Sequence, residues 1–115
     1  MSGEELTYCS LREVHDLLRT GEVSSGELVK AQLERLEALN PRLNQFITVA
    51  RDEALHAARS ADEAAARGEN MGPLHGVPLT VKDLLWTRGI CTTSGSKIFA
   101  DFVPEEDAKI GRAHV

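Results

Sequence analysis

The sequence predicts an α/β fold, and three observations in the 115-residue chain support this prediction. Two stretches, residues 10–20 and 24–40, carry apolar side chains at helical spacing behind a capping box. Two short runs rich in β-branched residues, 46–50 and 77–81, have the composition of buried strands. An alanine-rich helical stretch, residues 51–67, separates these runs, and the order strand, helix, strand implies a right-handed parallel crossover.

The first expected helix follows Ser10, which can exchange hydrogen bonds with Glu13 three positions later in a capping box. Gly21 supplies a stop signal after the last apolar position. One face of this helix is apolar and consists of Leu11, Val14, Leu17 and Leu18.

The second expected helix begins in the same way, with Ser24 and Glu27, and ends at Asn40-Pro41 because the residue before a proline disfavours helical backbone. Only a few residues join the two helices, so we expect a helical hairpin whose stripes face a common core. The stripe of the second helix consists of Val29, Leu33 and Leu36.

The alanine-rich helix carries a narrow stripe of small side chains, which predicts close packing against another element, and Gly68 marks its end. The stripe consists of Ala54, Ala58, Ala61 and Ala65. Beyond residue 83 the pattern is irregular: residues 98–99 could anchor a single helical turn, and residues 104–107 resemble the acidic start of a helix that does not continue. Two parallel strands do not close a core, so we expect this chain to be the front of a longer protein.

Composition excludes several classes of function. Thirteen basic residues against 18 acidic ones give a net charge of -5, which does not suit a nucleic-acid binder. No stretch has the length and apolarity of a membrane span, and residues 1–20 lack signal-peptide features, so we expect a cytoplasmic protein. Cys9 and Cys91 are far apart and show no metal-binding spacing, so we treat both as reduced thiols.

A set of motifs in the second half of the chain resembles the amidase signature family. The motifs are Gly-Pro-Leu-His-Gly-Val-Pro-Leu-Thr-Val-Lys-Asp at residues 72–83, Thr-Thr-Ser-Gly-Ser at 92–96, and Asp-Ala at 107–108. The predicted helices and strands also occur in the order found in that family. The resemblance implies the N-terminal portion of the family's fold: a helical hairpin followed by the strand-helix-strand start of a mixed, largely parallel sheet, here incomplete.

The resemblance also implies acyl transfer by a serine nucleophile, a second serine on a cis peptide bond, and a lysine that acts as base through the second serine. Lys82 matches the lysine. A lysine is a base only when uncharged, and burial at the end of an apolar strand disfavours the ammonium form. We expect Leu79 and Val81 to supply part of that apolar surrounding.

The remaining motif residues are expected to support Lys82 without reacting. Asp83 is expected to orient Lys82 by hydrogen bonding, and Gly76 and Pro78 to shape the preceding loop. We interpret the next loop as structural support; it consists of Thr92, Thr93, Ser94, Gly95 and Ser96. Both family serines and the oxyanion hole belong to a segment beyond residue 115, so this chain alone should have no activity.

The complete protein is therefore expected to hydrolyse a small-molecule carboxamide without a metal or organic cofactor. An alternative within the family is the A subunit of a glutamyl-tRNA(Gln) or aspartyl-tRNA(Asn) amidotransferase, with partner subunits and tRNA. Residues 84–86, Leu-Leu-Trp, resemble stand-alone amidases more, because the amidotransferase more often has Asn after Lys-Asp. A non-catalytic binding module is the alternative from another class. The substrate amide and the oligomeric state stay open.

Residues 1–109 are thus expected to form the N-terminal part of an amidase domain, whereas residues 110–115, Ile-Gly-Arg-Ala-His-Val, do not match the family. A widely used sequencing-library adapter encodes these six residues in one reading frame and would supply the last two bases of the Lys109 codon. We hypothesise that the native sequence is read only as far as Ala108, and genomic DNA tests this hypothesis.

Overall fold

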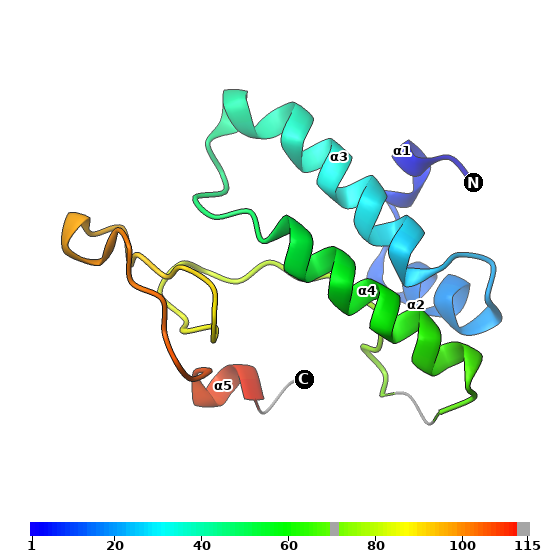
Figure 1. Cartoon of the computed structure of the whole chain (residues 1–115). Helices are drawn as coiled ribbons and strands as arrows, with labels where there is room; N and C mark the ends of the chain where they lie inside the picture. The colour runs from blue at the N-terminus through cyan, green and yellow to red at the C-terminus, as the bar shows by residue number, and fades with distance from the viewer. Residues whose placement is uncertain (70–71, 113–115) are drawn as a thin grey trace. The chain divides into compact units, whose positions relative to one another are not determined.

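The computed structural model describes residues 1–69 and 72–112, and the chain divides into two compact units (Figure 1). The helical unit comprises Met1–Gln45 and Arg51–Pro78. The loop unit comprises Phe46–Ala50 and Leu79–Val115, of which the last three residues lie outside the description. In the described part of the chain, no helix is long and apolar enough to cross a membrane.

Helix α2 (Leu11–Thr20) confirms the first predicted helix. The Ser10 side chain accepts a hydrogen bond from the Glu13 amide, and the Glu13 carboxylate accepts one from the Ser10 amide. The Ser10 hydroxyl first, and then its amide, hold the pKa of the Glu13 carboxyl below its ordinary value. Gly21 ends the helix in the left-handed conformation, with φ of 76°.

A short helix, α1 (Gly3–Leu6), precedes α2 and was not predicted. It begins with the same reciprocal hydrogen bonds, here between Ser2 and Glu5. The Ser-x-x-Glu spacing was present in the sequence, but four helical residues leave no room for an apolar periodicity to reveal the helix.

Helix α3 (Ser25–Leu43) confirms the second predicted helix, including the capping box of Ser24 with Glu27, but its predicted end at Asn40-Pro41 is wrong. The helix passes through Pro41 and ends at Asn44, whose φ is 49°. Pro41 removes one intrahelical donor, and only Arg42 and Leu43 follow it before the helix ends, so the helix stops within one turn of the proline.

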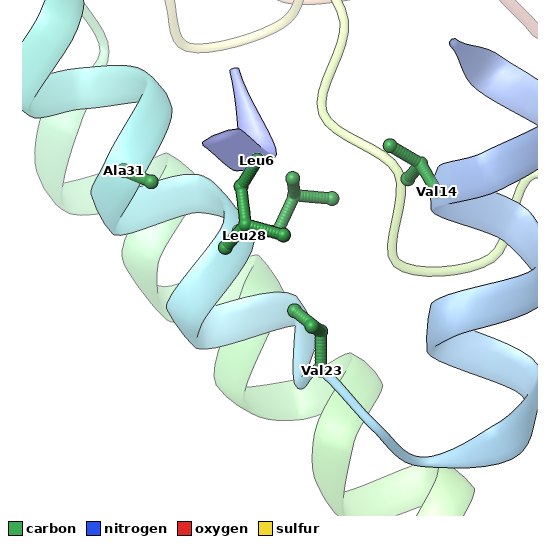
Figure 2. Close-up of a cluster of buried hydrophobic side chains, with 5 residues drawn as sticks. All are labelled: Leu6, Val14, Val23, Leu28 and Ala31. Atoms are coloured by element: carbon green, nitrogen blue, oxygen red, sulfur yellow. The ribbon is translucent and has the colours of Figure 1, made fainter. Parts of the chain in front are cut away.

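The first apolar cluster joins α1, α2 and α3 in the helical unit. Figure 2 shows its buried members, which are Leu6, Val14, Val23, Leu28 and Ala31. Leu17 and Leu18 pack against this cluster from α2, whereas Leu11, predicted on the same face, is 57% exposed. The expected hairpin core is therefore present, and α1 completes it.

The predicted stripe of α3 faces a different partner. Val29 and Leu33 are buried against Ala58 of α4 (Arg51–Ala66), with Ala54 and Leu55 around them. The two helices run side by side (Figure 1). Helix α3 thus has two apolar faces, one toward α1 and α2 and one toward α4. The close packing predicted for the alanine stripe is confirmed at Ala54 and Ala58, where small side chains let the helices approach, whereas Ala65 is exposed.

The two predicted strands are wrong within the described residues: neither 46–50 nor 77–81 forms a strand there. Ile47, Leu79 and Val81 are exposed rather than buried. A helix makes its hydrogen bonds within one segment, but a strand exists only beside a partner. Since the described residues offer no such partner, the strand-helix-strand crossover and the α/β class inferred from it are not seen in this chain, which is helical.

The loop unit is organised by an irregular antiparallel pairing of residues 86–92 with 102–108. The Gly89 amide donates to Pro104 (3.0 Å), and two further bonds, from Thr92 to Phe102 and from Ala108 to Trp86, extend the pairing in both directions. The rings of Trp86 and Phe102 lie 5.4 Å apart, which supports the same pairing.

Two short helical turns complete the loop unit. The turn η1 (Lys97–Phe99) lies where the sequence suggested a single turn, and the Ser96 hydroxyl caps it by accepting the Ile98 amide. Helix α5 (Lys109–Arg112) begins five residues after the Pro104 start that the acidic residues suggested. Pro104 is instead buried and its carbonyl serves the antiparallel pairing, so the acidic segment is not the start of a helix.

Candidate active site

Lys82 lies in the loop unit, in an exposed segment. Leu79 and Val81, predicted to surround it with apolar side chains, are 65% and 47% exposed. Among the described residues, the ammonium group has no hydrogen-bond or ion-pair partner. The expected burial of Lys82 is therefore wrong for this part of the chain, because burial at a strand end depends on a sheet that these residues do not form.

The main chain on the C-terminal side of Lys82 is nevertheless tightly tied. The Lys82 carbonyl accepts hydrogen bonds from the amides of Leu84 (2.8 Å) and Leu85 (3.0 Å). The next carbonyl, that of Asp83, accepts a bond from the Ser94 amide at 2.7 Å. The carbonyls of Lys82 and Asp83 are thus both fixed by hydrogen bonds. These bonds define the direction of the backbone from which the Lys82 side chain projects.

The Asp83 side chain contacts Thr93 at two points. Its Oδ1 accepts the Thr93 amide at 2.8 Å, and its Oδ2 accepts the Thr93 hydroxyl. The Thr93 hydroxyl, then its amide, and to a lesser degree the Gly95 amide lower the pKa of the Asp83 carboxyl from its ordinary value. We refer to this two-point contact as the Asp83–Thr93 clasp.

The Thr-Thr-Ser-Gly-Ser loop turns back directly after the clasp. Ser94 and Gly95 both have positive φ, 52° and 65°, and the Ser96 amide closes the turn on the Thr93 carbonyl at 2.9 Å. The Gly95 amide donates to the Thr93 hydroxyl oxygen and the Ser94 amide to Asp83. All three amides are occupied within the loop unit, so they are not free to stabilise an oxyanion.

Gly76 is fixed in the helical unit by a side chain that the sequence did not single out. Its carbonyl accepts the hydroxyl of Ser25, which is 2% exposed, at 2.7 Å. Gly76 has φ of 75°, and a Cβ there would lie 3.2 Å from the Ser25 Cβ. Both the backbone conformation and the close approach therefore require glycine. Pro78, two residues later, is half-buried.

Ser25 is in turn tied to α4 through Asp62. The Asp62 carboxylate accepts the amides of Ser25 (2.7 Å) and Gly26 (2.9 Å), which are the first two unpaired donors of α3. No local pattern in the sequence marks this cap, because the acceptor lies 36 to 37 residues from the donors.

The Asp-Ala motif at 107–108 also has a structural role in the loop unit. The Asp107 carboxylate accepts the Arg88 amide at 2.8 Å, and the Ala108 amide donates to the Trp86 carbonyl. Within the described residues, no cluster of three or more His, Cys, Asp or Glu side chains could hold a metal ion. A cavity of about 350 Å³ lies in the helical unit beside the α2–α3 connection, and Lys82 does not line it.

A family model described as Amidase matches residues 27–112, which include Lys82, the Asp83–Thr93 clasp and the Asp-Ala motif. This chain belongs to the amidase family. The match begins inside α3, so it covers part of the helical unit and most of the loop unit.

Curated relatives resemble almost the whole chain. The A subunit of the glutamyl-tRNA(Gln) amidotransferase of Geobacter sulfurreducens is 49% identical over 106 residues, and that of Moorella thermoacetica is 44% identical over 108 residues. These alignments cover 92% and 94% of this chain but 22% of each relative. The chain thus spans about a fifth of the length of the curated relatives it matches.

A solved structure has the same arrangement of this region. It is described as "An unexpected vestigial protein complex reveals the evolutionary origins of an s-triazine catabolic enzyme", and it matches with a TM-score of 0.85 and 28% identity. The match covers 90% of this chain and 23% of the solved one. The chain therefore has the fold of the corresponding part of that protein.

Proposed function

We propose that this chain is the N-terminal part of an enzyme that cleaves the C–N bond of a carboxamide, with Lys82 as the catalytic base. The observation that carries the proposal is the family match over residues 27–112, within which Lys82 precedes an aspartate that is hydrogen-bonded to the Thr-Thr-Ser-Gly-Ser loop. Within the described residues the Lys82 ammonium has no partner while hydrogen bonds hold the main chain beside it, which supports a role in which the rest of the enzyme supplies the partners.

In the proposed reaction a serine oxygen, from a segment outside this chain, attacks the amide carbon and gives its proton to Lys82 through a second serine. The C–N bond then breaks, and the leaving nitrogen takes that proton to depart as ammonia or an amine. Water hydrolyses the resulting ester, releases the acid and restores the serine. Lys82 must enter the cycle uncharged, so the remainder of the enzyme must shield it from water.

The same chemistry serves a second candidate, the A subunit of a tRNA-dependent amidotransferase. The names of the relatives, which are 42% to 49% identical to this chain, support this candidate. Here glutamine would be the amide, and its ammonia would pass to a misacylated tRNA through partner subunits. The Leu-Leu-Trp run at residues 84–86 supports the stand-alone hydrolase. A cytoplasmic location is part of the proposal in both forms.

The test is to recover the full gene, produce the protein, and measure release of ammonia or amine from a panel of aliphatic, aromatic and peptide amides. Hydrolysis without a partner, lost in Lys82→Ala, would support the stand-alone hydrolase. Glutamine-dependent amidation of tRNA that requires co-expressed subunits would identify the amidotransferase. If the folded wild-type protein showed neither activity, this result would contradict the proposal and favour a non-catalytic module.

The proposal also keeps residues 1–109 as amidase sequence and residues 110–115 as adapter-derived, although the family match extends to residue 112. Recovery of the gene tests this division directly. We expect the native codons to differ from Ile-Gly-Arg-Ala-His-Val after Lys109, and finding these six codons contiguous in genomic DNA would contradict it. Residues 113–115 lie outside the part that the structure describes.

A further inference from the structure

We propose that Thr93 is a positioning residue for the catalytic base, and that its clasp on Asp83 fixes the main chain from which Lys82 projects. This inference rests on the proposed function of Lys82. It assigns to one threonine of the Thr-Thr-Ser-Gly-Ser loop a role that its neighbours do not share.

The first support is that every polar group of Thr93 is used. Its amide and hydroxyl donate to the two carboxylate oxygens of Asp83, and its hydroxyl oxygen accepts the Gly95 amide at 3.2 Å. Its carbonyl accepts the Ser96 amide at 2.9 Å. The side chain is buried, with 8% exposure. A hydroxyl that both donates and accepts has a single orientation, so Asp83 is bound by a rigid group.

The second support is that the clasp lies one peptide bond from Lys82. The Asp83 carbonyl accepts the Ser94 amide, so the main chain and the side chain of Asp83 are both bound by consecutive residues of one loop. On the other side of Lys82, residues 79–81 are exposed and make no backbone hydrogen bond within the described part of the chain. The position of the Lys82 Cα is therefore determined from the Asp83 side.

The third support is a contrast with the adjacent threonine. Thr92 is even more buried, at 3% exposure, but its hydroxyl donates to the Ile90 carbonyl at 3.2 Å and its amide to Phe102. Thr92 thus stabilises the antiparallel pairing and does not contact Asp83 or Lys82. If the loop only supported the structure, loss of either threonine hydroxyl would affect melting temperature and kcat in the same way.

The experiment compares Thr93→Val, Thr93→Ser and Thr92→Val in the full-length enzyme, with melting temperature, kcat and KM measured for each. Valine keeps the shape of threonine and removes the hydroxyl. Both valine variants should lower the melting temperature. Only Thr93→Val should lower kcat strongly, by about ten- to a hundredfold, with KM changed less than about threefold, because a misplaced base slows the chemical step. Thr93→Ser, which keeps the hydroxyl, should recover most of kcat.

Equal kcat losses in the two valine variants, or no recovery in Thr93→Ser, would overturn the inference. Should Thr93→Val fail to fold, Asp83→Asn breaks the clasp from the other side, and a kcat equal to that of the wild type in this variant would overturn it equally. Lys82→Ala separates the two proposals. Full activity in Lys82→Ala contradicts the proposed function itself, whereas loss there with normal Thr93→Val kinetics contradicts only the positioning role.

Discussion

The helical unit and the loop unit are stabilised in different ways. In the helical unit, each of the first three helices begins with a local capping box, the Ser25, Gly26, Asp62 and Gly76 hydrogen bonds span 36 to 51 residues, and apolar side chains are buried in two clusters. In the loop unit, single side chains such as Asp83, Thr93 and Asp107 make hydrogen bonds across 10 to 19 residues. Large apolar side chains there stay exposed, up to 89% at Ile98. Lys82, the proposed catalytic base, lies in the unit that contributes no buried apolar cluster among the described residues.

Among the variants that test this difference between the units, Leu28→Ala in the helical unit should have the largest effect on the free energy of unfolding. Leu28 is 1% exposed in the first cluster, so its truncation should lower the free energy of unfolding by about 2 to 5 kcal/mol. The measurement is urea unfolding of the 115-residue chain followed by circular dichroism at the helix band. Leu43→Ala changes a side chain that is 61% exposed in the last turn of α3. This variant should change the free energy of unfolding by less than about 0.5 kcal/mol. Equal effects would mean that the cluster is not the core.

Gly76→Ala should have the next largest effect, about 2 kcal/mol or more, since it combines positive φ with a close approach to Ser25. Gly21→Ala is the matched control, because Gly21 has nearly the same φ, 76°, but has no atom within 4 Å of an added Cβ. Its expected cost is about 1 kcal/mol from backbone strain alone. Indistinguishable unfolding midpoints for the two variants would show that the Ser25–Gly76 contact is loose in solution.

Asp62→Ala should lower the free energy of unfolding by about 1 to 2 kcal/mol, because it leaves the amides of Ser25 and Gly26 without their cap. Glu63→Ala changes the adjacent, exposed carboxylate and serves as control, with an expected change below about 0.5 kcal/mol. Amide hydrogen exchange should speed up at Ser25 and Gly26 in the first variant alone. Unchanged exchange at these two amides would contradict the cap.

The smallest effect is the pH dependence of the Asp83–Thr93 clasp in the loop unit. The folded-state pKa of Asp83 is lowered below its ordinary value of about 3.9, so the clasp contributes its full stability above that value and loses it as pH falls through the lowered pKa. The amide resonance of Thr93, followed by NMR between pH 6 and 2, should shift in this acid range. Thr93→Val should move the midpoint up toward the ordinary value, and Asp83→Asn should abolish it. A midpoint at or above the ordinary value in the wild type would contradict the clasp.

The sequence predicted what local interactions determine. Ser10 with Glu13, Ser24 with Glu27, and the stop at Gly21 are contacts within one turn of the chain, and all were readable from spacing. The alanine stripe also predicted close packing, which holds at Ala54 and Ala58. The end of α3 was missed because Asn40 keeps helical backbone although a proline follows it.

The sequence could not predict what distant partners determine. The 46–50 and 77–81 runs have strand composition, but a strand needs a neighbour that these residues do not provide. Asp62 as the cap of α3 and Asp107 as the acceptor for Arg88 join residues 19 to 37 positions apart, and no local pattern marks them. Lys82 and its motif were identified only through family resemblance, because one exposed lysine carries no signal of its own.

The most direct test of the central claim, serine acyl transfer with Lys82 as base, does not require the substrate to be known. A fluorophosphonate reacts with an activated serine hydroxyl, and its rate of attachment to the full-length protein can be measured by mass spectrometry. The account predicts a single modified serine outside residues 1–109 in the wild type and labelling at least about a hundredfold slower in Lys82→Ala. Equal labelling rates in the two proteins, or no labelling of the folded wild type, would contradict it.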